Sequence, residues 1–218
     1  MNDHTFGKLT DAIKRRGGGV PVVKCPELRE VLEELFTEEE ADLACLLPKE
    51  AASADMLVTQ TSRSRKEIED ILEAMAYKGL VLSLKAGDKR TYRLFGLAPS
   101  IFENQLSTGI VSDRTRRIAT LIKQYSRALL NQGQDVIKLF PKVPFARIIT
   151  VEKNIDHDVA ILPHDKLTPY IDSAEAITLI TCHCKQMGEL LGKPCSKPKE
   201  VCLAVGDVAQ YFAEHGIG

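Results

Sequence analysis

The sequence predicts an α+β protein: a winged helix-turn-helix domain near the N-terminus, a long linking helix, and a small C-terminal α/β domain that carries a cysteine motif. Three observations indicate this fold. Residues 53–95 follow the order helix, turn, helix and hairpin. A long amphipathic helical pattern comes after that hairpin. The last third of the chain holds four of the six cysteines.

We divide the chain into an N-terminal tail (1–25), a winged-helix domain (26–97), linking helices (98–140) and a cysteine-motif domain (141–218). A length of 218 residues is sufficient for two domains. The net charge of −1 creates no overall field that would attract nucleic acid or a membrane. No apolar run approaches the roughly 20 residues that cross a bilayer, and no signal peptide is recognisable, so we expect a cytoplasmic protein without membrane contact.

The first 25 residues combine a short helical pattern at 6–13 with the basic run Lys14, Arg15 and Arg16 and three glycines. Consecutive glycines form a flexible joint because glycine restricts the backbone least. Two interpretations stay open for this tail: a solvated segment, or a basic arm that contacts nucleic acid.

Residues 26–47 predict two helices. Apolar residues of the first are spaced at i, i+3, i+4 and i+7, namely Leu28, Val31, Leu32 and Leu35. Thr37 is followed three residues later by Glu40, which is the signature of a capping box at the start of the second helix. That helix contains Cys45, which we interpret as a core residue, and it stops before Pro48.

Residues 53–95 have the order of a winged helix-turn-helix. A short helix at 53–59 and a turn at 62–64 precede a longer helix, capped by Ser64 with Glu67 in the capping-box position. Gly79 ends this helix, and strands at 81–84 and 91–95 around a Gly-Asp turn form a hairpin, the predicted wing.

DNA binding by this domain is a separate question, because a fold does not define a function. Residues 26–97 carry 15 acidic and 10 basic side chains, an excess with the wrong sign for phosphate contact. The basic residues nevertheless cluster on the predicted recognition helix and wing: Arg63, Arg65, Lys66, Lys85, Lys89, Arg90 and Arg93. This cluster is either a local grip on DNA phosphates or an ordinary charged surface of a domain used for protein interaction or dimerisation.

The linking segment predicts a long helix. Ser112 and Asp113 cap it, and Gly133 ends it. One face is apolar, with Ile118, Leu121, Ile122, Tyr125, Leu129 and Leu130. We expect this face to pack against a second copy in a homodimer, or else within its own chain.

The C-terminal part begins with a predicted strand at 147–151 and an Asp-His-Asp triplet at 156–158, which does not form a ligand set because consecutive residues of an extended segment face opposite ways. A helix around Tyr170 and a buried strand at 177–181 follow. We predict a closing helix over 201–215, which would place Cys202 at a helix start that favours a thiolate.

The four clustered cysteines are Cys182, Cys184, Cys195 and Cys202, with the spacing C-x-C-x10-C-x6-C. Four thiolates in a tetrahedral array suit Zn²⁺ or an iron–sulfur cluster. Disulfides and buried free thiols are the alternatives. The loop at 185–200 is rich in glycine and proline, so we expect it to depend on the metal for its order.

With these residues in view, the chain resembles a family of iron–sulfur proteins of anaerobic bacteria and archaea. The resemblance lies in runs 35–41, 92–95, 101–103, 162–165, 182–185, 192–195 and 200–203. Family members join a winged-helix-like region to a cysteine motif, and most continue into a two-cluster ferredoxin-like domain. The resemblance implies a 4Fe–4S cluster on Cys182, Cys184, Cys195 and Cys202. Two departures are Lys185, where arginine is common in the family, and the missing ferredoxin-like part.

These observations predict a cytoplasmic iron–sulfur protein for electron transfer or redox sensing, which works with a redox partner protein or a ferredoxin domain. Two alternatives remain: a metal- or redox-responsive winged-helix regulator that binds DNA, and a structural zinc protein. No nucleophile–base pair is recognisable, and the three glycines lack the lysine and serine of a phosphate-binding loop, so we do not expect catalysis by this chain alone.

Overall fold

The computed structural model describes residues 1–87, 89–133, 138–140 and 168–217. These residues form helices and two small antiparallel sheets, which confirms the α+β class. The predicted strand at 147–151 and the Asp-His-Asp triplet lie outside the described residues.

The N-terminal region contains the helix predicted at 6–13, but this helix is longer than predicted and belongs to the core, so the interpretation of residues 1–25 as a tail is wrong for residues 3–15. Helix α1 (Asp3–Arg15) is capped by Asn2, whose side chain accepts a hydrogen bond from Thr5 N at 2.9 Å. Its apolar face is buried: Phe6, Leu9, Ala12 and Ile13. These residues recur every three to four positions, so one face of α1 packs against α3 and removes apolar surface from water.

The next helices start where the capping signals predict. Helix α2 (Pro26–Leu35) buries its four predicted apolar residues. Helix α3 (Glu38–Leu46) begins with the capping box of Thr37 and Glu40, in which Thr37 N donates to Glu40 Oε2 at 2.9 Å. After the short helix α4 (Ala54–Val58), helix α5 (Arg65–Tyr77) begins with the capping box of Ser64 and Glu67. Both boxes are therefore confirmed.

The predicted hairpin is also present. Strand β1 (Val81–Ala86) pairs with β2 (Lys89–Leu94) in antiparallel register, from Val81 opposite Leu94 to Ala86 opposite Lys89. Gly87 has a φ of +64° at the turn, a conformation that suits glycine. The hairpin therefore follows α5 as expected.

An irregular turn, η1 (Leu97–Ile101), and helix α6 (Phe102–Asn104) lead to the long helix α7 (Asp113–Asn131), which Ser112 caps as predicted. Helix α7 packs against α2, and its Tyr125 hydroxyl donates to Pro21 O at 2.8 Å. Most of the predicted apolar face is thus buried within the same chain. Leu130 is the exception, because its side chain is 74% exposed on the other side of the helix.

The C-terminal part contains α9 (Thr168–Asp172), β3 (Ile177–Thr181), α10 (His183–Leu190), β4 (Glu200–Val205) and α11 (Asp207–Glu214). The predicted closing helix over 201–215 is wrong in its first part. Val201, Leu203 and Val205 alternate with smaller residues in the period of a strand, and β4 pairs with β3. Gly206, with a φ of +65°, makes the turn into α11.

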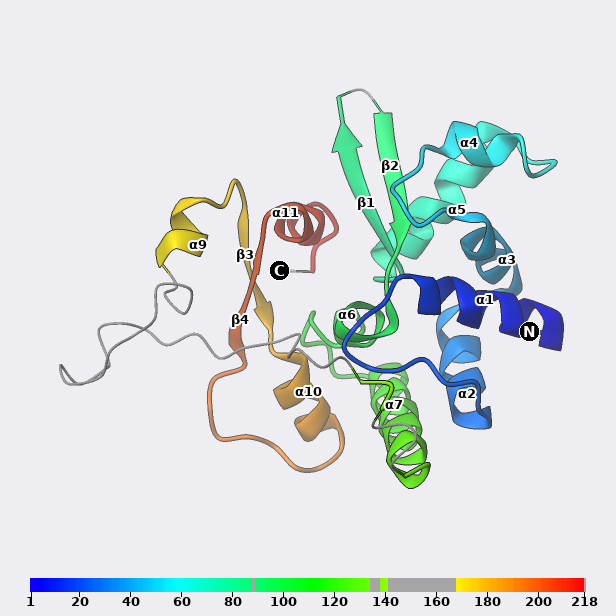
Figure 1. The fold of residues 1–218 in the computed structure, drawn as a ribbon. Coiled ribbons are helices and arrows are strands. Elements are labelled where there is room, and N and C mark those ends of the chain that lie inside the picture. The colour runs from blue at the N-terminus through cyan, green and yellow to red at the C-terminus, as the bar shows by residue number, and fades with distance from the viewer. Residues whose placement is uncertain (88, 134–137, 141–167, 218) are drawn as a thin grey trace.

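Helix α11 lies between the two sheets and joins the halves of the molecule (Figure 1). It contacts β3 and β4 on one side and β1 on the other. Tyr211 and Phe212 belong to the same buried cluster as the N-terminal helices, and Tyr211 Oη donates to Ala76 O of α5 at 2.5 Å. The C-terminal helix is therefore part of the main core.

The outer face of the β3–β4 sheet is open to solvent and apolar: Ile177, Leu179, Val201, Leu203 and Val205 are each 44–52% exposed. None of the helices in the described part of the chain has the length and hydropathy of a membrane span.

Candidate metal centre

The first cysteine of the motif, Cys182, lies where β3 ends and α10 begins. It is buried, and it occupies the N-cap position of α10. A register shift at Ile180 and Thr181 ends the regular pairing with β4, and Cys182 N then donates to Lys199 O at 2.8 Å. The strand predicted at 177–181 is therefore present and leads directly into Cys182.

Cys184 is in the first turn of α10 and is exposed. Its sulfur lies 3.3 Å from His183 Nε2, and the same ring nitrogen lies 3.5 Å from Glu103 Oε1. Burial lowers the pKa of His183, while the negative charge of Glu103 acts in the opposite direction. A neutral imidazole is thus favoured beside the thiol.

Cys202 lies in β4, opposite Ile180 of β3, and it is half-buried. We predicted a helix start at Cys202, but the cysteine at a helix start is Cys182. The strand assignment could have been found from the alternation of Val201, Leu203 and Val205, which competes with a helical pattern that begins at Val205.

Cys195 is exposed in the loop between α10 and β4. The loop is held by contacts of its own: Lys185 Nζ donates to Pro198 O at 2.6 Å, and Lys193 N donates to Gly188 O at 2.7 Å. Lys199 forms an ion pair with Glu189 at 2.5 Å. Residues 183–190 form a helix with buried Gln186 and Leu190, and the expectation that residues 185–200 depend on a metal for their order stays a prediction.

Three of the thiols lie close enough to affect one another's ionisation. Burial acts to raise the pKa of Cys182, but hydrogen bonds from the Lys185 amide, the Cys202 thiol and the Cys184 amide together lower it. Burial and the interaction with Cys182 raise the pKa of Cys202 to about 11. Burial and the charge of Cys182 also raise the pKa of Cys184. Of these three thiols, only Cys182 has a lowered pKa, and it lies next to the N–H groups of a helix start.

The donor chemistry fits a thiophilic metal or cluster, but the side chains do not form a closed ligand shell. Among the described residues, no three His, Cys, Asp or Glu side chains are placed so that they hold a metal ion together. The interactions above link Cys182, Cys184 and Cys202 and do not include Cys195. All six cysteines are free thiols, so the disulfide alternative does not describe this structure.

The two cysteines outside the motif are in the N-terminal half. Cys25 precedes α2, and Cys45 is in α3; both are half-buried against the main core. Burial raises the pKa of both thiols, to about 11 in the case of Cys45. They behave as buried apolar thiols, as the sequence indicated for Cys45.

The predicted phosphate-contacting residues are largely paired with acidic side chains. Arg63 pairs with Glu39, Arg65 with Asp55 and Glu69, and Lys66 with Asp70. Arg90 pairs with Glu73 at 3.8 Å and with Glu214 of α11 at 3.0 Å. Lys85, Lys89 and Arg93 form no ion pair within the part of the chain that the structure describes.

Comparison of this chain with protein-family models, with curated proteins and with solved structures finds no match.

Proposed function

We propose that Cys182, Cys184, Cys195 and Cys202 bind one iron–sulfur cluster of the 4Fe–4S type, and that the protein transfers electrons or senses redox state. One observation supports this most. Three of the four thiols interact at the junction of β3, α10 and β4, and the fourth lies in the loop that joins the last two elements. A movement of that loop would bring Cys195 to the other three.

The bound cluster would supply one-electron transfer. The chain contributes hydrogen bonds to sulfur and control of exposure, which are the usual means of tuning such a site. The Lys185 and Cys184 amides direct N–H groups at Cys182, and β3 and β4 fix the spacing between Cys182 and Cys202. In this proposal the electrons pass to a redox partner protein or a ferredoxin-like domain, and the protein works in the cytoplasm, where thiols stay reduced.

Metal analysis of anaerobically purified protein tests this function. We expect iron and inorganic sulfide in equal amounts, with visible charge-transfer absorption. Cys184→Ser and Cys195→Ser should each lose the absorption, whereas Cys45→Ser, a change at a half-buried thiol outside the motif, should retain it. A colourless protein that contains one zinc per chain would contradict the cluster and would support the structural zinc alternative. If Cys45→Ser lost as much iron as Cys184→Ser and Cys195→Ser, iron binding would not be specific to the four cysteines of the motif.

A second candidate is a redox-responsive winged-helix regulator, and one set of contacts favours it. Helix α11 follows the strand of Cys202 directly and reaches the hairpin through the ion pair of Glu214 with Arg90. His215 of the same end lies 3.4 Å from Glu73 of α5. A change at the cysteines could therefore be transmitted to the predicted recognition helix and wing.

Fluorescence anisotropy with labelled genomic DNA fragments tests this candidate. Binding should weaken steeply with salt, and replacing Lys85, Lys89 and Arg93 by alanine should reduce it. The ion pairs of Arg63, Arg65 and Lys66 weigh against a strong phosphate grip at α5. Absence of binding at low salt would exclude the regulator and leave the electron-transfer proposal unaffected.

A further inference from the structure

A cationic pocket lies away from the cysteines, where the end of α1, the segment after α3, the end of β2 and the start of α11 meet. Its volume is about 340 Å³. Arg16, Lys49 and Arg93 line it together with several backbone segments, and Val208 of α11 closes one side. None of the described residues that line it is acidic. The pocket therefore concentrates positive charge in a space large enough for a small molecule.

The three cations differ in how they are held. The Arg16 guanidinium is fixed, because it donates hydrogen bonds to the carbonyls of Leu47, Pro48 and Lys49 at the end of α3. Its Nε atom is buried and has no hydrogen-bond partner. Lys49 and Arg93 are exposed and, as far as the described residues go, have no carboxylate partner. A buried donor without an acceptor is rare and costly, so the positive charge of Arg16 at the pocket is not fully compensated within the described part of the chain.

The positive charges of Arg15 and Arg93 also repel that of Arg16. The pKa of Arg16 is lowered, first by burial and then by the charges of Arg93 and Arg15, while Glu50 acts in the opposite direction. An anion bound between Arg16 and Arg93 would relieve this repulsion.

Two glycines let the backbone segments that line the pocket pack closely. A Cβ atom on Gly18 would lie 2.5 Å from Ala98 O, and one on Gly96 would lie 2.7 Å from Gly17 O. No side chain larger than hydrogen fits at either position, so the segments at 17–18 and 96–98 can meet at the pocket.

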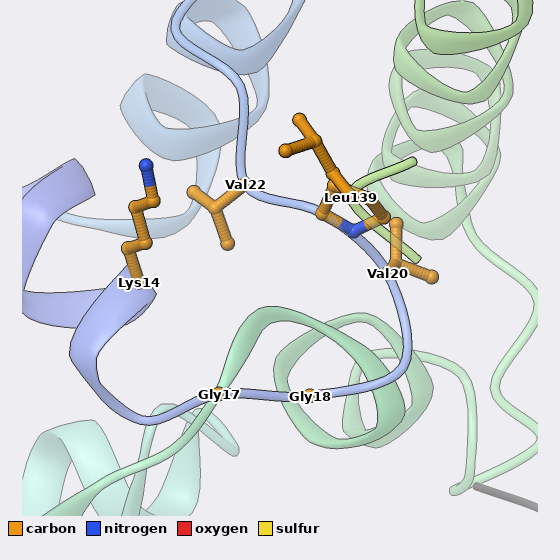
Figure 2. Close-up of a pocket in the computed structure, with 7 residues that line it drawn as sticks. Lys14, Gly17, Gly18, Val20, Val22 and Leu139 are labelled. Carbon is orange, nitrogen blue, oxygen red and sulfur yellow. The ribbon is translucent and has the colours of Figure 1, made fainter. Parts of the chain in front are cut away.

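Gly17 and Gly18 also line a second pocket of about 180 Å³, which Figure 2 shows. Its side chains are mainly aliphatic, with Val20, Val22 and Leu139 near one cation, Lys14. Among the described residues that line it, this second pocket has one cation where the first pocket has three, so it is less suited to an anionic ligand.

We propose that the pocket of Arg16, Lys49 and Arg93 binds a small phosphate ester through its phosphate group. A phosphate is a dianion that matches several cations, and guanidinium groups bind it through paired hydrogen bonds. Lys49 and Arg93 contact the phosphate directly, and Arg16 provides a fixed positive charge behind them. The volume exceeds that of one phosphate and leaves room for the organic part, and Val208 is one of the apolar residues that line it.

Isothermal titration of the full chain with ribose 5-phosphate, and separately with inorganic phosphate, tests the proposal at constant ionic strength. We expect saturable binding of both probes, with the ester bound at least as tightly. Lys49→Ala and Arg93→Ala should each weaken binding about tenfold or more, since a charge-assisted hydrogen bond is lost. Lys85→Ala removes an exposed lysine of the hairpin outside the pocket and should bind as the wild type does.

Circular dichroism establishes that each variant is folded. Equal affinity of the Arg93→Ala and wild-type proteins would overturn the proposal, as would an equal loss in Lys85→Ala or the absence of saturable binding. Binding of inorganic phosphate alone would overturn the assignment of an ester. Tight binding of duplex DNA without binding of ribose 5-phosphate would overturn it in favour of a nucleic acid. Cys195→Ser should bind the ester normally, which separates this site from the cluster proposal.

Discussion

Tyr211 connects α11 to the main core, and its removal should destabilise the whole protein. The ring is fully buried, stacks edge to face on Phe95 with centroids 5.4 Å apart, and donates its hydroxyl to Ala76 O. Ala76 O also accepts from Gly79 N at 2.9 Å, so it keeps a partner when the hydroxyl is lost. We therefore expect Tyr211→Phe to cost only about 1 kcal/mol.

Tyr211→Ala removes the whole ring and leaves a cavity, for which about 3–5 kcal/mol is expected, as for other large aromatic residues. Urea unfolding followed by circular dichroism measures both changes, and a single transition is expected because α11 shares the core of the N-terminal helices. Leu130→Ala on exposed α7 surface is the control, with a change below about 0.5 kcal/mol.

Two results would refute this reasoning. A loss below about 1 kcal/mol in Tyr211→Ala would mean that the ring is not packed as described. Two separate unfolding transitions, of which only one responds to the substitution, would mean that α11 and the β3–β4 sheet unfold independently of the N-terminal helices.

Three further predictions concern local features. Ser64→Ala removes the capping box of α5 and should destabilise the protein by about 1 kcal/mol in urea unfolding, whereas an unchanged midpoint would show that Glu67 alone satisfies the helix start. Burial raises the pKa of Tyr125 from 10.0 to about 12, so its neutral form contributes stability below pH 10 that is lost as the pH rises toward 12. In Tyr125→Phe the free energy of unfolding should fall less steeply between pH 10 and pH 12 than in the wild type. The same dependence on pH in both proteins, measured by urea unfolding, would contradict this prediction. Gln186 is buried and donates to Gly109 O at 3.1 Å and to Ile110 O at 3.2 Å. Gln186→Leu removes this donor from both carbonyls and should lower the free energy of unfolding by about 1–3 kcal/mol. Amide hydrogen exchange in α10 should then become faster, and an unchanged exchange rate would contradict the contact.

The elements that depend on neighbouring residues could be predicted from the sequence. The capping boxes at Thr37 and Ser64 join groups three residues apart, and the Ser112 cap is equally local. The hairpin turn needs a positive φ, which Gly87 supplies. In each case the hydrogen bond or dihedral angle that defines the element lies within the same short segment.

Elements that depend on distant partners were predicted less well. A helical pattern at 6–13 was recognised, but the burial of α1 depends on its packing against α3, so the segment was interpreted as a tail. Residues 201–205 fit a strand and the start of a helix about equally, and pairing with β3 decides for the strand. Leu130 continues an apolar stripe in sequence, but none of the elements that the structure describes covers it.

The candidate sites divide in the same way. The sequence by itself determined which residues can bind a soft metal and that a strand leads into Cys182, because thiol chemistry and strand propensity are properties of the residues. Only the tertiary structure decided that Cys202 approaches Cys182 across β3 and β4, and that Arg63, Arg65 and Lys66 meet carboxylates. It also brought Arg16, Lys49 and Arg93 to one pocket from three separate segments. These groupings arise because burial of apolar surface brings segments distant in sequence together, and the charged and thiol groups they carry come together with them.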